Sequence, residues 1–233
     1  MAARREPSAA RLRLALTSLT MAGTMAIDDN VLKTLKPEPL GDIVGRVRDG
    51  DILLCSATDP FSRLIRWSTK SPWSHVALAY RWRSVSRIMV FEAVQTIGVH
   101  AVTLDRFISQ TSTGQKPYPG NIILARHEAY ADKGGAAGGA AMNRLADFAV
   151  DRFGDRFDGL EILKIAARII FGRTGRKMPK FLGPKRAFIC SEYAAKCFEA
   201  VGIEIKWDGR GFIAPASFAS DPAVKAIAQF ETR

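Results

Sequence analysis

The sequence predicts an α+β fold built as one large domain. Candidate strands gather in the middle of the chain, with helical patterns before and after them rather than between them. A doubly wound parallel sheet needs strands and helices in alternation, so that architecture is not favoured. The length of 233 residues and the hydrophobic content of 47% suit a single core, and no internal repeat divides the chain. We expect an antiparallel sheet packed against helices.

The first predicted elements lead into a hairpin. The run GDILLC, residues 50–55, has the length and apolar content of a short strand after a turn. PFSRLIRWST, residues 60–69, starts with proline and carries apolar residues at helical spacing, which predicts a helix. Two β-type runs follow, SHVALAY at 74–80 and RIMVFEAV at 87–94, around the polar stretch RWRSVS. We expect these two strands to pair across that turn.

Further strands and helices complete the predicted order. GVHAVTL at 98–104 and NIILARH at 121–127 are two more candidate strands. Between them, Asp105 is predicted to cap the short helix RFISQ. The remaining helical patterns cover residues 140–153, residues 159–171 and a stretch from Cys190 that ends at Gly202.

The charge of the chain is positive and unevenly distributed. The formal net charge is +11, and no acidic residue occurs from Ile162 to Ser191. Basic residues between positions 164 and 186 make this block attractive to anions, so it predicts either contact with an anionic membrane surface or a solvated basic face. Zinc-finger, helix-turn-helix and aromatic–basic RNA-binding motifs are absent, so we expect no nucleic-acid partner.

Residues 1–26 allow two interpretations. Arginines, a weakly apolar run and a small-residue site resemble a secretory signal, but hydroxyl side chains interrupt the run. Translation from Met21 or Met25, or a disordered tail, also explains the pattern, and we favour these. We therefore expect a cytoplasmic protein with its folded domain over 27–233; a periplasmic or secreted location is the alternative. No later segment has about 18 uninterrupted apolar residues, so we expect no membrane span.

The three cysteines predict free thiols. An odd number gives no disulfide framework. Cys190 and Cys197 fall on one predicted helix, roughly 10 Å apart by helical rise, which is too far for a bridge. Cys55 and Cys197 have the surroundings of small core residues, whereas Cys190 stands where a strand-like run becomes a helix.

His75 and Glu92 are candidate catalytic residues on the two strands of the hairpin. His75 shares its strand face with two alanines, which leave space beside the ring. Glu92 is ionisable within an otherwise apolar strand, which is costly without a partner. If the chain turns between Arg83 and Ser84, the two residues face each other with β-carbons roughly 4.5–5.5 Å apart. A one-residue slip would put them on opposite faces.

Cys190 completes a candidate catalytic set. Free N–H groups and the positive dipole end of a helix lower the pKa of a thiol and can receive an oxyanion. A nucleophilic thiol also needs a base and a group that orients the base, which His75 and Glu92 supply. His100, on the next strand, is the alternative base or orienting group if the register differs, and otherwise an edge or surface histidine. We expect His127 on the surface.

The segments GDILLC, SPWSHVALAY, FEAV, FICSEYAAKCFEAVG and IAPASFASDP, within residues 42–222, carry a family resemblance. In this order they resemble the permuted papain-like amidases, relatives of the bacterial NlpC-type cell-wall peptidases and of lecithin–retinol acyltransferase. The histidine strand comes before the cysteine helix in this group, as it does here. The resemblance implies a circularly permuted papain-like fold of NlpC type, with Cys190 as nucleophile, His75 as general base and Glu92 as its orienting group.

The resemblance also extends to positions around these three. It implies substrate contacts at Ser74, Asp158, Ser191 and Tyr193, and a terminal loop at APASFASDP. Two departures stand out. Ile189 precedes the cysteine where the family often has tyrosine, and the basic insert before Cys190 is longer than the family pattern.

The resemblance implies a cysteine-dependent hydrolase or acyltransferase that works through a thioester. A peptide, an acylated amine or a lipid ester could be its substrate. We expect no cofactor and no metal, because the three histidines do not cluster at ligand spacing, although Cys190, His75 and Glu92 are residue types that also bind zinc. Two other classes stay open: a non-catalytic acyl- or peptide-binding protein, and a membrane-surface interaction protein that uses the basic region 162–191.

Overall fold

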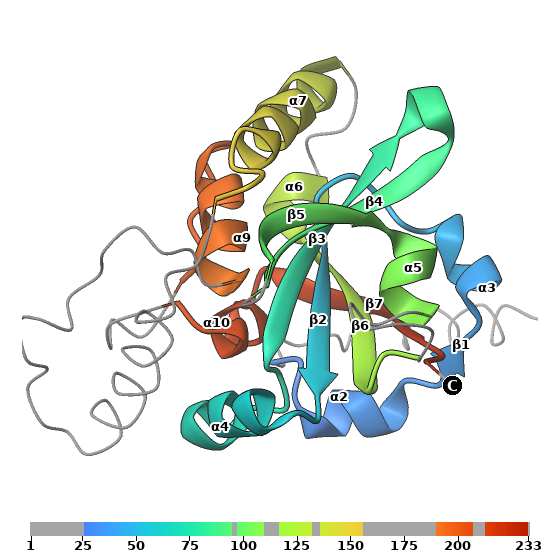
Figure 1. Cartoon of the computed structure of the whole chain (residues 1–233), viewed down its shortest axis with the longest axis vertical. Helices are drawn as coiled ribbons and strands as arrows, with labels where there is room; N and C mark the ends of the chain where they lie inside the picture. Colours follow the sequence, from blue (N-terminus) through green and yellow to red (C-terminus); the bar gives the residue numbers. More distant parts are fainter. Residues whose placement is uncertain are drawn as a thin grey trace, which may run out of the picture.

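The chain folds around a mixed seven-stranded sheet with helices on both faces (Figure 1). The computed structural model describes residues 26–94, 97–109, 117–131, 136–155, 190–206 and 213–232. The strand order is β1-β7-β6-β2-β3-β4-β5. Every neighbouring pair is antiparallel except β1 and β7, which run parallel. The predicted α+β class is confirmed, but the sheet is not antiparallel throughout.

The strands are β1 (Pro37–Glu38), β2 (Asp51–Ala57), β3 (His75–Trp82), β4 (Arg87–Val94), β5 (Gly98–Thr103), β6 (Gly120–His127) and β7 (Val224–Phe230). The helices before the sheet's last strands are α2 (Asp29–Thr34), α3 (Leu40–Val44), α4 (Pro60–Thr69), the 3₁₀ turn η1 (Arg83–Val85) and α5 (Leu104–Ser109). The later helices are α6 (Glu128–Ala131), α7 (Ala136–Val150), α9 (Cys190–Glu199) and α10 (Pro215–Ser220).

Two apolar clusters lie on the two faces of the sheet. Successive side chains of a strand point to opposite faces, so Val76 and Leu78 join one cluster while Ala77 and Ala79 join the other. The first cluster packs under α7, α9 and α10, and the second under α3 and α5 (Figure 1). β2 lies near the middle of the sheet and is buried along its whole length, which makes it the rigid element beside the candidate site.

Most elements predicted in the middle of the chain are confirmed. The helix predicted over 60–69 is α4, with Asp59 capping its first N–H groups and proline at its start. The runs predicted as strands form β2 to β6 within two residues of the predicted bounds. α9 begins at Cys190, and Gly202 follows it with a φ of +76°, which glycine adopts without strain.

Some predicted elements are wrong in position or type. β5 runs directly into α5, so Asp105 lies in the first turn of α5 and does not cap it. The helix predicted over 140–153 spans Ala136–Val150 instead. The segment expected as a terminal loop forms α10, because Pro215 starts a helix whose Phe218 is buried in the core. The alternating run Val224–Phe230 forms β7, which was not predicted.

Several predictions fall outside the described residues. They concern most of the segment 1–26, the helix over 159–171, Asp158 and most of the basic region 162–191. Within the part of the chain that the structure describes, no helix combines the length and the apolar character needed to cross a membrane.

Candidate active site

The first residue of β3, His75, is held beside the end of β2. Ser74 donates its backbone N–H to the Cys55 carbonyl at 2.9 Å, and its hydroxyl accepts the N–H of Ala57 at 3.0 Å. His75 then pairs with Cys55 in the ladder between the two strands. This anchoring on a buried central strand fixes where the imidazole leaves the sheet.

Glu92 of β4 meets His75 on the same face, although not in the predicted register. Opposed residues of β3 and β4 include Leu78 with Phe91 and Ala79 with Val90, a register two residues away from the predicted one. The difference arises because β3 continues to Trp82 and the chain turns through η1, so the turn between Arg83 and Ser84 is wrong. A shift of two keeps the face, since side chains alternate with a period of two. The His75 Nε2 therefore still lies 2.8 Å from the Glu92 Oε2, on a diagonal.

His100 of β5 is the direct neighbour of Glu92 and belongs to the site. The two residues pair in the β4–β5 ladder, and the His100 Nε2 lies 3.2 Å from the Glu92 Oε1. Its Nδ1 lies 3.3 Å from the Gly98 carbonyl oxygen. His100 is half-buried on β5, which is an edge strand, so the edge interpretation fits and the surface interpretation is wrong. Its role as an alternative base or orienting group stays a prediction.

Cys190 is positioned by the rigid helix α9. The inner face of α9 packs into the core through Tyr193, Cys197 and Phe198, all fully buried. The Tyr193 hydroxyl donates to the Ala149 carbonyl of α7 at 3.0 Å, which ties the two helices together. The thiol stands at the first residue of α9, where backbone N–H groups have no partner within the helix.

The Cys190 thiol and the His75 ring are hydrogen-bonded to each other. Since the Nε2 of His75 is taken by Glu92, the Nδ1 is left for the sulfur. Burial raises the pKa of the Cys190 thiol, but the charge and hydrogen bond of His75, with the N–H groups of Val76 and Ser191, outweigh it. The net effect is a pKa below the ordinary 9.0, so the thiolate is favoured.

The pKa values of His75, Glu92 and His100 are shifted by the contacts of these residues with one another. Burial alone lowers the pKa of His75, but the charge and hydrogen bonds of Cys190 and then of Glu92 raise it to about 10. Burial alone raises the pKa of Glu92, but hydrogen bonds from His100 and His75 lower it to about 2. The hydrogen bond to Glu92 raises the pKa of His100 above its ordinary value. The shifts all favour the charged forms, so that negative and positive groups would alternate along Cys190, His75, Glu92 and His100.

Cys55 and Cys197 lack this environment, as predicted. Both are fully buried, and all three cysteines are free. Burial raises the pKa of Cys197 to about 12 and raises that of Cys55 well above its ordinary value. Cys55 also shares a hydrogen bond with Tyr118, a residue that the sequence analysis did not single out. No sequence pattern around Tyr118 indicates this contact, because it depends on how Tyr118, just before β6, packs against Cys55 of β2.

The side chains of the three described residues predicted to contact substrate bond within the protein, and their contact with a substrate stays a prediction. Ser74 is buried and bonds to the end of β2. Ser191 is fully buried, and its hydroxyl donates to the Ile213 carbonyl at 2.6 Å. The Tyr193 hydroxyl bonds to α7, as described above. Their side chains therefore hold the nucleophile and the base in place, and Asp158 lies outside the described residues.

His127 lies in the interior of the protein, which corrects the surface prediction. Its ring is 5.9 Å from that of Phe198, and only 5% of the residue is exposed. Burial lowers the pKa of His127, and its Nδ1 has no hydrogen-bond partner among the described residues. The residue is a packing element under α9, away from the charged set around Cys190.

No group of three or more histidine, cysteine, aspartate or glutamate side chains in the described part of the chain is arranged to hold a metal ion. The zinc interpretation of Cys190, His75 and Glu92 therefore gains no support from their geometry. In the described arrangement, the His75 Nε2 contacts the Glu92 carboxylate.

The chain has a structural likeness to a solved protein. No protein-family model and no curated protein sequence matches it. The crystal structure of metalloprotein yiiX from Escherichia coli O157:H7, described as DUF1105, aligns with a TM-score of 0.53. The two are 17% identical, and the alignment covers 78% of this chain and 96% of that one. The likeness is one of fold. At this identity it supports a shared α+β arrangement and carries no residue roles.

Proposed function

We propose that the protein is a cysteine-dependent hydrolase or acyltransferase that acts on an amide or ester bond. The observation that carries this proposal is the chain of contacts from Cys190 through His75 to Glu92, with the His75 Nε2 2.8 Å from the carboxylate. A nucleophile, a base and an orienting group in this order are what covalent acyl transfer needs.

In the first half of the reaction, the Cys190 thiolate attacks the carbonyl carbon and a C–S bond forms. Backbone N–H groups at the start of α9, where Ser191 already contacts the thiol, would stabilise the oxyanion in this proposal. The His75 imidazolium gives its Nδ1 proton to the leaving amine or alkoxide as the C–N or C–O bond breaks. A thioester on Cys190 and a neutral His75 remain.

In the second half, water or another acceptor attacks the thioester. His75, now neutral, takes the proton of the acceptor, and the C–S bond breaks to return the thiolate–imidazolium pair. Glu92 keeps the ring in place and stabilises its positive charge in the resting state, and His100 holds the other carboxylate oxygen. His100 thus acts through Glu92 as a positioning residue.

The fold we propose is a circularly permuted papain-like one. It is supported by the chain order, in which the histidine strand β3 comes before the cysteine helix α9, and by the packing of α9 against β3 and β4. The substrate classes we propose are peptides, acylated amines and lipid esters. We also propose a reducing cytoplasmic location, since the nucleophile and two further thiols are free.

The name of the yiiX neighbour includes the word metalloprotein. We do not extend a metal site to this chain, because the described residues offer no group able to hold one. Every step proposed above is carried by side chains and backbone of the chain itself.

The test is selective labelling followed by thioester trapping. We expect iodoacetamide at pH 6 to modify Cys190, which is 6% exposed, faster than it modifies glutathione. Cys55 and Cys197 should stay unmodified because they are 0% exposed and their pKa values are raised. Incubation with activated peptide, acyl-amine and lipid-ester donors should leave an adduct on Cys190, detected by mass. Cys197→Ala on the same helix is the matched control and should keep the adduct. Labelling no faster than that of glutathione would favour a non-catalytic binding protein.

A further inference from the structure

Helix α4 presents a narrow stripe of basic and aromatic side chains. The helix joins the end of β2 to the start of β3, and its Ser62 and Ile65 are buried against the protein. The exposed residues Arg63, Trp67 and Lys70 follow at intervals of four and three, so they share one face of the helix. Trp67 is 55% exposed, which is high for the largest apolar side chain. This stripe is separate in sequence from the basic region 162–191.

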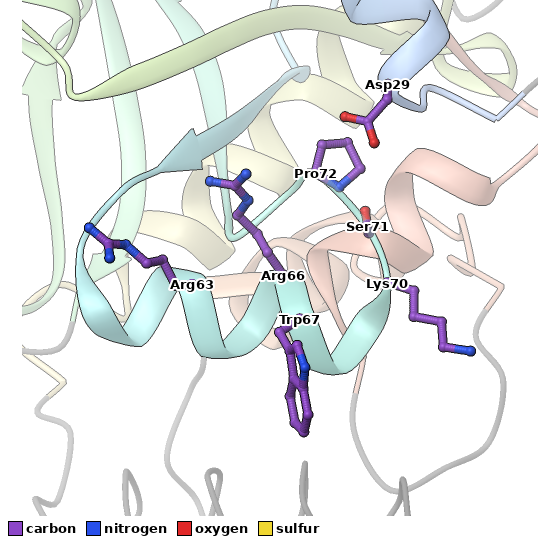
Figure 2. A pocket seen from close by; sticks show the side chains of 7 residues that line it. All are labelled: Asp29, Arg63, Arg66, Trp67, Lys70, Ser71 and Pro72. Carbon is purple, nitrogen blue, oxygen red and sulfur yellow. The ribbon is translucent and has the colours of Figure 1, made fainter.

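A hollow of about 510 Å³ opens beside the stripe (Figure 2). In Figure 2 the two arginines reach toward the end of β2, Trp67 points away from the helix axis and Lys70 leaves its far end. The Arg63 Nε donates to the Thr58 carbonyl at 2.7 Å, and an Arg66 terminal nitrogen donates to the Ala57 carbonyl at 3.2 Å. These carbonyls orient the guanidinium groups without neutralising their charge. The residues that line the hollow are Asp29, Arg63, Arg66, Trp67, Lys70, Ser71 and Pro72.

The arrangement favours a charged surface over a small free anion. Asp29, on α2, lines the inner side of the hollow and repels an anion that enters it. Arg63 and Lys70 are exposed before and after Trp67 along the helix, and Arg63 also donates to the Thr58 carbonyl. A ring with one apolar body and one polar N–H, flanked by lysine and arginine, is suited to the head-group layer of a bilayer.

A nucleic-acid strand fits the stripe less well. Strand-binding surfaces use several aromatic rings along a groove that covers about four or more nucleotides. Among the residues that line the hollow, Trp67 is the aromatic one. The cations from Arg63 to Lys70 extend over about 10 Å of helix axis, a short track for a polymer.

We propose that the exposed stripe of α4, made of Arg63, Trp67 and Lys70, docks on an anionic phospholipid bilayer. Trp67 lies in the head-group layer, and the two cations lie beside lipid phosphates. Because α4 leads through five residues into His75, docking would hold the Cys190 site near the bilayer. The binding itself requires no reaction at Cys190, so it stands or falls separately from the proposed function.

The experiment measures co-sedimentation of the full chain with vesicles of phosphatidylcholine containing about 30% phosphatidylserine. Each Lys or Arg close to such a surface contributes about fivefold in partitioning, so Arg63→Gln/Lys70→Gln should lower the partition constant about 25-fold. Arg87→Gln/Arg106→Gln removes the same charge from exposed positions elsewhere and should change it far less. Trp67→Ala is compared with Trp82→Ala, which removes a ring that is 51% exposed at the hairpin tip.

The expected result is strong loss in the two α4 variants, little loss in the two controls, and weakening of wild-type binding in 0.5 M salt. Cys190→Ala should bind like the wild type, which separates docking from chemistry. Unchanged vesicle binding of Arg63→Gln/Lys70→Gln would overturn the proposal, as would equal losses in both charge variants. Loss of single-stranded RNA binding with vesicle binding intact would assign the stripe to nucleic acid and overturn it too.

Discussion

Replacing Glu92 by glutamine tests whether this carboxylate maintains the charge of the His75 ring. The substitution keeps the shape of the side chain and one oxygen acceptor while removing the negative charge. In the folded protein the pKa of Glu92 is about 2, against an ordinary value of 4.5. That difference corresponds to about 3 kcal/mol in favour of the ionised carboxylate. Burial acts against ionisation, so the two histidines supply this preference and more.

By linkage, the histidines are stabilised in their charged form by the same interaction. Loss of the carboxylate charge therefore lowers the pKa of both rings, since Glu92 raises the pKa of His75 and of His100. His75 would still be charged through its contact with Cys190, but less strongly. We therefore expect Glu92→Gln to lower the pH at which His75 loses its proton from near 10 by about one to two pH units.

The assay is the second-order rate of Cys190 alkylation by iodoacetamide between pH 5 and 10, followed by intact mass. The wild type should keep a reactive thiolate from acidic pH upward, with a further change near pH 10 as His75 loses its proton. Glu199→Gln removes an exposed carboxylate from the same helix and serves as the matched control. A Glu92→Gln profile whose change stays near pH 10, with unchanged circular dichroism, would refute the reasoning.

Three further predictions concern positioning, pH and stability. His100→Gln removes one charged donor from Glu92, so the pKa of Glu92 should rise and the acid limb of the alkylation profile should move to higher pH; an unmoved limb would contradict the positioning role. Burial lowers the pKa of His127, so below about pH 6.5 the unfolded chain binds a proton that the folded one resists, and stability falls as pH falls. His127→Leu should therefore lose less in Tm between pH 7 and pH 5 than the wild type, and an equal loss would count against it. Arg126→Met leaves the buried carboxylate of Asp51 without its 2.7 Å partner and should cost about 3–5 kcal/mol in urea unfolding, largely recovered by adding Asp51→Asn; a loss near zero would contradict the pairing.

Local patterns predicted much of the sheet and the helices α4 and α9. The bounds of α4 follow from Asp59, Pro60 and helical spacing, which act over a few residues. The strands from β2 to β6 follow from apolar runs bounded by turn residues. β7 was not predicted, although apolar and polar side chains largely alternate over Val224–Phe230. The family resemblance implied a loop at the neighbouring segment APASFASDP. Its place beside β6 and β1 depends on contacts with strands far away in the chain.

The sequence indicated which residues form the candidate site, but not how they are arranged. His75, Glu92 and Cys190 were identified by residue type, strand face and helix start. The hairpin register was wrong by two because the length of the turn is set by η1, whose 3₁₀ geometry was not recognised in RWRSVS. The set still meets, since an even shift preserves the face.

The sequence by itself determined which side chains share a strand face and where a helix begins, because backbone periodicity is local. Only the tertiary structure decided that His100 pairs with Glu92, that Ser74, Ser191 and Tyr193 bond inward, and that His127 is buried. These outcomes depend on which surfaces pack together, and burial and partner distance set the charge of an ionisable group. The sequence sets which residue types occur along each strand and helix, whereas tertiary packing sets their burial and their partners.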